Sequence, residues 1–318
     1  MKGSLNRVYS WALSTSRLCV LLALILLALM QILRVDLSIS AQMVIALVAL
    51  LIGVPHGAID HLIAIPSRPR LLFIAYIAIY IAVALIAGWV ISNWELLGFQ
   101  IVVMMSALHF GFGDASFHNE TREASGSRRY SLMTSLCYAI PAGLLPLILP
   151  LTDKRTMNSL ERINPSLIDW AGSDQRILRI AVLVFSGVFL FLLSLKRKFD
   201  LVIDLLLLLI FSLVAPPLIS FAIYFGLWHA LRHTARLVPK LPSARAHAMR
   251  AHWKVAIVKV IAPGLYAVVL TVGVAIFLGF QFPDYFSTSV LWSSLVVVWS
   301  LTVPHMMTTA KFDLRALR

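Results

Sequence analysis

The stretch from Leu71 to Ser92, LLFIAYIAIYIAVALIAGWVIS, consists of 22 residues without a charged side chain. A transmembrane helix needs roughly 20 apolar residues to cross a hydrocarbon core of about 30 Å. The whole chain of 318 residues is similar in character, with 60% hydrophobic residues, 13% charged residues and a mean hydropathy of +0.89. Soluble domains carry about 45–50% apolar and about 25% charged residues, so this composition excludes soluble enzymes, secreted disulfide-rich domains and disordered chains. The sequence predicts a polytopic membrane protein.

Apolar runs along the chain predict an all-α bundle with about ten spans. Two prolines, Pro216 and Pro217, interrupt the apolar stretch 200–236 and divide it into two spans, because proline cannot continue a helix. The first span follows a basic leader and lacks a small-x-small cleavage site, so we expect it to be retained. The ten expected spans are 17–33, 41–62, 71–92, 96–113, 132–150, 177–195, 200–215, 217–236, 254–280 and 288–308. Residues 1–318 are expected to form one membrane domain, with a leader (1–16), a bundle (17–308) and a tail (309–318).

The positive charges predict the orientation of these spans. The chain has 27 Lys and Arg against 14 Asp and Glu, a net charge of +13. If the N-terminus is cytoplasmic, 21 of the cations fall on the cytoplasmic side and 6 on the outer side. This distribution follows the positive-inside rule and predicts that both termini are cytoplasmic. We expect the protein in the plasma membrane. The charge is therefore expected to contact lipid headgroups rather than nucleic acid. The one long outer loop, 151–176, is a candidate for a surface helix.

Histidines are the residues that indicate function. Six of the nine fall at or near the ends of even-numbered spans, which all run in the same direction, and are therefore expected at one depth near the cytoplasmic face: His56, His61, His109, His229, His233 and His305. Polar groups within hydrocarbon cost several kcal/mol unless they have partners. The pattern predicts a metal or haem site. His118, His247 and His252 are expected in loops, as interfacial side chains. Cys19 and Cys137 have no spacing typical of a redox or thiolate metal site.

Spacing ranks the candidate ligands. His229 and His233 are four residues apart, so both rings project from one helix face and can bind the same ion. His56 and Asp60 have the same spacing, whereas His61 lies roughly 140° further around the helix. This favours His56 as a ligand, with Asp60 as an acceptor for its second ring nitrogen.

Further polar residues are candidates for supporting roles. Asp114 is a candidate acceptor near His109, and Arg232 is a candidate counter-ion for Asp60 or Asp114. His61 and His305 remain alternative ligands. Four neutral imidazoles suit Fe(II), Cu or Zn and leave coordination positions open. Nearby aromatic residues are expected either to line an apolar substrate tunnel or to face lipid: Phe110, Phe221, Tyr224, Phe225 and Trp228.

Four motifs resemble those of a known family, the Brp/Blh β-carotene 15,15'-dioxygenases of bacteria and archaea. They are Pro55-His-Gly-Ala-Ile-Asp60, His109-Phe-Gly-x-x-Asp114, Trp228-His-x-x-Arg-His233 and Pro304-His305, spread over residues 53–305. The resemblance implies an all-helical membrane enzyme that cleaves the central double bond of β-carotene with O2 to give two all-trans-retinal. It also implies delivery of retinal to a microbial rhodopsin. Matching the family's ligands to this sequence gives Fe(II) held by His56, His109, His229 and His233.

Three other functions were weighed against this one. A bis-histidine haem protein would show a Soret band. A di-iron desaturase or hydroxylase would need about eight clustered histidines, whereas this chain offers one HxxxH and no HxxHH motif. A carotenoid or retinal carrier or transporter without catalysis predicts broken helices with polar residues at mid-bilayer. The break at Pro216 lies at the opposite end of its span from the histidines, so it favours transport only weakly.

Overall fold

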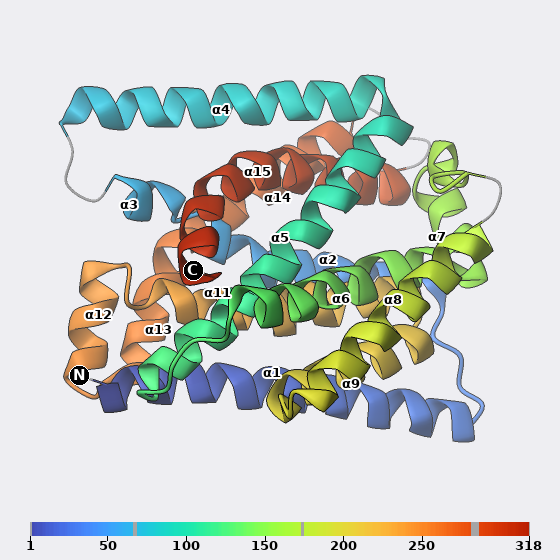
Figure 1. Cartoon of the computed structure of the whole chain (residues 1–318). Helices are drawn as coiled ribbons and strands as arrows, with labels where there is room; N and C mark the ends of the chain where they lie inside the picture. Colours follow the sequence, from blue (N-terminus) through green and yellow to red (C-terminus); the bar gives the residue numbers. More distant parts are fainter. Residues whose placement is uncertain (1, 66–68, 173–174, 281–285, 318) are drawn as a thin grey trace.

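The computed structural model describes residues 2–65, 69–172, 175–280 and 286–317, and these form helices joined by short connections (Figure 1). No strand occurs in these ranges. Met1 of the expected leader and Arg318 of the expected tail lie outside them. The α-helices are α1 (Lys2–Ile32), α2 (Ile39–Gly57), α3 (Asp60–Ala64), α4 (Arg70–Asn93), α5 (Glu95–Ala124), α6 (Leu132–Leu151), α7 (Lys154–Ile163), α8 (Gln175–Leu195), α9 (Phe199–Val214), α10 (Pro217–Ala222), α11 (Ala230–Leu237), α12 (Pro242–Met249), α13 (Trp253–Ile261), α14 (Leu265–Gly279) and α15 (Phe286–Leu317). Short 3-10 helices, η1 (Pro165–Leu167) and η3 (Ala262–Gly264), and a π-helix, η2 (Ile223–His229), complete the set.

Eight helical segments within the described residues are long and apolar enough to cross a membrane. They are Gly3–Ile32, Ile39–Ala64, Arg70–Asn93, Glu95–Ala124, Leu132–Leu151, Gln175–Leu195, Trp253–Val274 and Leu291–Leu317. These segments confirm the prediction of an all-helical membrane protein, but they do not confirm a count of ten. The two remaining expected spans, 200–215 and 217–236, correspond to α9, which has 16 residues, and to the composite helix α10–η2–α11.

The break at the two prolines is confirmed. Helix α9 ends at Val214, and α10 begins with Pro217, which occupies the first helical turn, where a backbone N–H has no partner within the helix. From there the chain continues as one composite helix whose middle part, η2, is π-helical. A π-helix has wider turns than an α-helix and is frequently found at functional sites. Here it ends at His229, so the irregular backbone lies directly beside a candidate ligand.

Several expected boundaries change in the structure. Helix α15 continues to Leu317, through most of the expected tail 309–318, and α1 includes residues 2–16 of the expected leader. His247, expected in a loop, lies in α12. Helix α5 continues to Ala124, well beyond the expected end at 113, so His118 lies inside a helix and is buried rather than in a loop. The polar residues after Gly113 stay helical because their partners lie on neighbouring helices, which a local pattern does not show. Within the expected outer loop 151–176 a helix is present, as predicted: the amphipathic helix α7, followed by the short helix η1.

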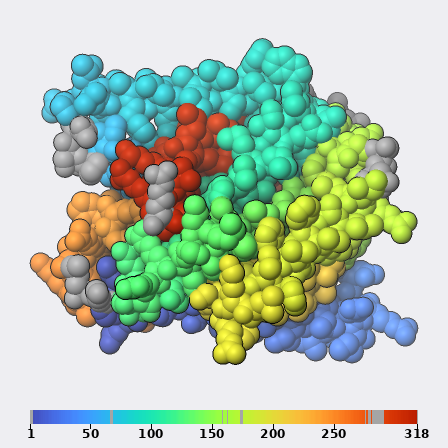
Figure 2. Space-filling view, viewed as in Figure 1, coloured from blue at the N-terminus to red at the C-terminus, as the bar shows by residue number. Residues whose placement is uncertain are grey.

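Helices α5 and α6 form the centre of the bundle, and α4 lies at its edge. A Cβ atom on Gly111 would overlap the carbonyl oxygen of Ala139, and one on Gly143 would overlap that of Ala107, so these two helices touch along their backbones. The glycine at 111 therefore serves close packing, and α5 runs through it unbroken. By contrast, only 6% of the apolar window of α4 is buried. Figure 2 shows α4 along the upper edge of the molecule, with α15 on its inner side.

Candidate metal centre

Three histidines meet in the interior of the bundle. The ring nitrogens that His109 on α5, His229 at the end of η2 and His233 on α11 offer all lie within 4.8 Å of one another, and all three side chains are buried. A set of three imidazoles at this separation can hold one metal ion. The four-residue spacing of His229 and His233 places both rings on one helix face, as the sequence predicts.

Two further histidines extend the group to five. The ring centroid of His56, near the end of α2, lies 5.0 Å from that of His233 and 5.3 Å from that of His229. The ring centroid of His305, on α15, lies 5.2 Å from that of His109 and 5.3 Å from that of His233. We call these five side chains the imidazole cluster.

Each ring of the imidazole cluster keeps at least one buried nitrogen that finds no hydrogen-bond partner within the described parts of the chain. These atoms are Nδ1 of His56, Nε2 of His109, Nε2 of His229, both ring nitrogens of His233 and Nε2 of His305. A buried polar atom without a partner costs about 1–3 kcal/mol, so five such rings in one place require an explanation. Neutral imidazole is a ligand for iron, copper, nickel and zinc, and the donor set therefore fits a metal ion of this group.

Asp60 supports the imidazole cluster through His305. Its carboxylate oxygens lie 2.9 and 3.1 Å from Nδ1 of His305, and the Tyr80 hydroxyl donates to the same carboxylate at 3.2 Å. A proton on Nδ1 leaves the lone pair of Nε2 directed into the cluster. The sequence spacing favoured His56 as the partner of Asp60 instead. That spacing does not hold, because α2 ends at Gly57 and a turn separates it from α3.

His61 does not join the imidazole cluster. It lies on α3, and its ring contacts that of Phe73 on α4 at a centroid distance of 6.0 Å. It lines the cavity beside the cluster without facing the other rings at close range.

Asp114 and Arg232 form a separate buried network. The indole N–H of Trp228 donates to Asp114 at 2.6 Å, and the Arg232 guanidinium lies 3.6 Å from Asp114 and 2.8 Å from Asp204. Asp114 therefore contacts Trp228 rather than His109, and Arg232 pairs with Asp114 rather than Asp60. His118 Nε2 also lies 2.8 Å from Asp204, which explains the burial of His118. Sequence reasoning missed Asp204, although a carboxylate beyond the first turn of the apolar helix α9 was a signal.

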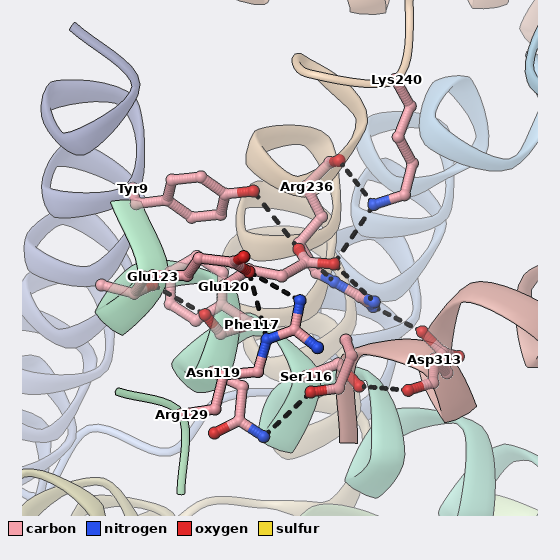
Figure 3. Close-up of polar contacts among 12 residues, drawn as sticks. Tyr9, Ser116, Phe117, Asn119, Glu120, Glu123, Arg129, Arg236, Lys240 and Asp313 are labelled. Carbon is pink, nitrogen blue, oxygen red and sulfur yellow. Dashed lines mark hydrogen bonds and ion pairs between the residues drawn. The ribbon is translucent and has the colours of Figure 1, made fainter. Parts of the chain in front are cut away.

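A second network, around Arg236, joins α5, α11 and α15 (Figure 3). The Arg236 Nε donates to Glu120 at 3.0 Å, and its Nη1 lies 2.7 Å from Asp313. Asp313 in turn lies 3.9 Å from Nδ1 of His109. Lys240 reaches Glu120 at 3.2 Å; its burial lowers the pKa of the ammonium group, and the Glu120 carboxylate acts in the opposite direction. Sequence reasoning assigned no role to these four charged residues.

An apolar cavity of about 220 Å³ opens beside the imidazole cluster. Phe110 and Phe225 line it together with His56, His109, His229 and His305. A second cavity of about 120 Å³ adjoins it, and Phe110, Phe221 and Phe225 line that one. Tyr224 and Trp228 are fully buried and are not among the described residues that line either cavity. Of the five aromatic residues expected around a tunnel, three therefore face these cavities.

Together, these features define an all-helical membrane protein with a buried group of imidazoles able to hold a metal ion beside an apolar cavity. The chain belongs to the β-carotene 15,15'-dioxygenase family, whose model matches residues 47–313. The match contains all the residues of the imidazole cluster and confirms the resemblance seen in the four sequence motifs. Neither a curated protein nor a solved structure matches the chain significantly.

Proposed function

We propose that this protein is a membrane-embedded non-haem iron dioxygenase that cleaves the central 15,15' double bond of β-carotene with O2, giving two molecules of all-trans-retinal. The observation that carries the proposal is the imidazole cluster itself, whose unpartnered nitrogens converge beside an apolar cavity in a chain of this family. Each carbon of the broken double bond gains one oxygen atom of O2, so the reaction needs no further reductant.

Four histidines are proposed as the iron ligands: His56, His109, His229 and His233. The ring geometry makes His305 the alternative or additional ligand. When bound, Fe(II) supplies the redox chemistry that activates O2. The protein positions the four ligands on three helical segments, α2, α5 and the composite helix α10–η2–α11, and Asp60 and the Arg236 network contact His305 and His109 from behind.

The cavity walls position the substrate and exclude water. The ring of Phe110 lies 4.4 Å from that of His229, so an apolar surface directly borders the imidazole cluster. A polyene that lies against this surface has its double bonds next to the imidazole rings. Holding the reacting bond at the site in this way makes the reaction effectively unimolecular. Because the site lies among membrane-spanning helices, a lipid-soluble carotenoid reaches it from the bilayer.

The cellular setting belongs to the same proposal. We place the single membrane domain in the plasma membrane, with both termini and the metal centre on the cytoplasmic side, on the basis of the distribution of Lys and Arg. The retinal product is proposed to serve a microbial rhodopsin.

The test is retinal formation in bacterial cells that make β-carotene, with and without this protein. We expect loss of the orange colour and the appearance of retinal, with iron in the purified protein. Unequal apocarotenals would overturn the cleavage position. Carotenoid bound without turnover would instead support a carrier, and a Soret band would support a haem protein.

A further inference from the structure

Three cavities lie next to one another, and four of the five rings of the imidazole cluster line the middle one. The histidine-lined cavity shares four lining residues with the second cavity: Phe110, Phe225, Val298 and Thr302. On another side it shares Tyr76 and Tyr80 of α4 with a third cavity of about 710 Å³. A long molecule can therefore extend away from the imidazole cluster in two directions.

The second cavity, which we call the apolar arm, is bounded by α5, α6, α7, η1, α10 and α15. No charged side chain is among the described residues that line it, whereas Lys240, Lys311 and Arg315 line the third cavity. The side chains at the α7 and η1 end of the arm are mostly buried, among them Leu160, Ile163 and Leu167. The arm therefore resembles a closed apolar pocket more than a second opening.

Three of the four hydroxyl groups that line the apolar arm donate to the backbone, and Ser106 carries the fourth. Thr156 donates to the carbonyl oxygen of Pro150 at 2.5 Å, Ser159 to that of Arg155 at 3.4 Å and Thr302 to that of Val298 at 2.7 Å. These three groups have no free hydrogen to offer a ligand. An occupant of the arm gains mainly from apolar burial, which suits a hydrocarbon chain and its terminal ring.

We propose that the apolar arm receives one half of the polyene substrate and that its depth determines which double bond lies at the imidazole cluster. This inference rests on the proposed function and deepens it. A terminal ring held at the end of the arm fixes the distance from that ring to the reacting bond. Leu218, in the first turn of α10, lines the arm about three helical turns before His229, far enough from the ligands to be changed alone.

The experiment shortens or deepens the arm at Leu218. Purified Leu218→Trp and Leu218→Ala proteins are compared with wild type on β-carotene and on an apocarotenal truncated at one end. Leu213→Trp is the control, because Leu213 lies on α9 close before the proline break and is exposed. For Leu218→Trp we expect the turnover of the truncated substrate relative to β-carotene to rise at least about tenfold, a difference of about 1.4 kcal/mol in barrier. Leu213→Trp should leave this ratio unchanged.

Leu218→Ala should move part of the cleavage of β-carotene to an off-centre bond, giving aldehydes of unequal length. The inference would be overturned if Leu218→Trp left the substrate ratio unchanged. If Leu218→Trp does not fold, formation of the wild-type products alone by Leu218→Ala would overturn it. The same preparations are assayed for bound polyene by its absorbance. If wild type cleaves neither substrate, the proposed dioxygenase function fails. The role of the arm is then decided by binding: a higher ratio of truncated to full-length polyene bound by Leu218→Trp than by wild type supports it, and an equal ratio contradicts it.

Discussion

The two ring nitrogens of His305 have different surroundings. Nδ1 lies 2.9 Å from the Asp60 carboxylate, whereas Nε2 is buried among the other imidazoles without a partner in the described chain. Second partners of this kind fix the tautomer and orientation of a ligating histidine. His61 belongs to the same sequence motif as Asp60, but its ring contacts Phe73 instead. This contrast makes His305, and not His61, the candidate for an alternative or additional ligand.

The first prediction concerns iron binding. His305→Ala should lower the iron content of the purified protein, and Asp60→Asn should weaken iron binding by about 10–100-fold, because the amide no longer fixes the His305 ring as the carboxylate does. His61→Ala is the matched control and should retain iron. The measurement is iron per protein after dialysis against a graded chelator. Equal iron loss in all three variants would mean that the cavity wall in general, rather than His305, determines affinity.

A second prediction compares two arginine–glutamate pairs drawn in Figure 3. Arg236→Met removes the ion-pair partner of the buried Asp313 carboxylate and leaves Glu120 with Lys240, so we expect a loss of about 3–5 kcal/mol in the free energy of unfolding. Arg129→Met breaks the exposed pair with Glu123 and should cost less than about 1 kcal/mol. Equilibrium unfolding in mixed micelles measures both. Similar losses for the two variants would contradict the structural role given to Arg236.

At this scale, the sequence identifies histidines more readily than their partners. A histidine within an apolar run is conspicuous, and the spacing of His229 and His233 alone places both rings on one face. The partner of a carboxylate depends on which helices are neighbours. Asp60 therefore pairs with His305, 245 residues away, rather than with the nearby His56. Asp204 pairs with Arg232 and His118 for the same reason.

Helices α5 and α6 set the position of His109. Their backbones approach most closely at Gly111 and Gly143, where a Cβ atom would overlap a carbonyl oxygen of the opposite helix. Small residues at such contacts let membrane helices pack closely without a hydrophobic driving force. Since Gly111 is two residues from His109, the distance between these helices also determines where this imidazole lies.

The third prediction tests this contact. Gly111→Ala should destabilise the protein by about 1–3 kcal/mol, because the helices must separate to admit the methyl group. Gly187→Ala on α8, where a Cβ meets nothing within 4 Å, should be neutral or should stabilise by up to about 1 kcal/mol through helix propensity. Thermal unfolding in detergent, followed together with iron content, measures both effects. A stable Gly111→Ala protein with full iron content would show that the close contact is not required for the site.

Helix boundaries were predictable where composition changes abruptly and less so elsewhere. Pro216 and Pro217 ended α9 as expected, because proline acts locally. The π-helix from Ile223 to His229 has no comparable local signal, since it depends on how the composite helix packs against its neighbours. The extension of α5 to Ala124 also depends on hydrogen-bond partners elsewhere in the chain. Asn119 donates to the carbonyl oxygen of Ala316, and His118 forms a hydrogen bond with Asp204.

For the whole molecule, the arrangement of the helices agrees with the orientation across the membrane that the charges predict. Figure 1 shows the N-terminus and the C-terminus toward the same side of the bundle, the side where α3, α12 and α13 also lie. The basic segment from Arg232 to Lys259 passes through α12 and α13 on this side. Cations are retained on the cytoplasmic side of a membrane during insertion, so this clustering connects the fold with the expected topology.

The final prediction is the topology itself. Because the expected topology places 21 of the Lys and Arg residues on the cytoplasmic side and 6 on the outer side, a reporter that works only in the cytoplasm should be active when it is fused after the C-terminus. Inserted near Asn164, between α7 and η1, the cytoplasmic reporter should be silent, and a reporter that is active only outside should give a signal. A pair of reporters with opposite requirements, one that fluoresces in the cytoplasm and one that is enzymatically active only outside it, gives a positive signal on each side. A C-terminal fusion active outside would reverse the orientation and place the imidazole cluster near the outer face, where the positive-inside rule does not predict it.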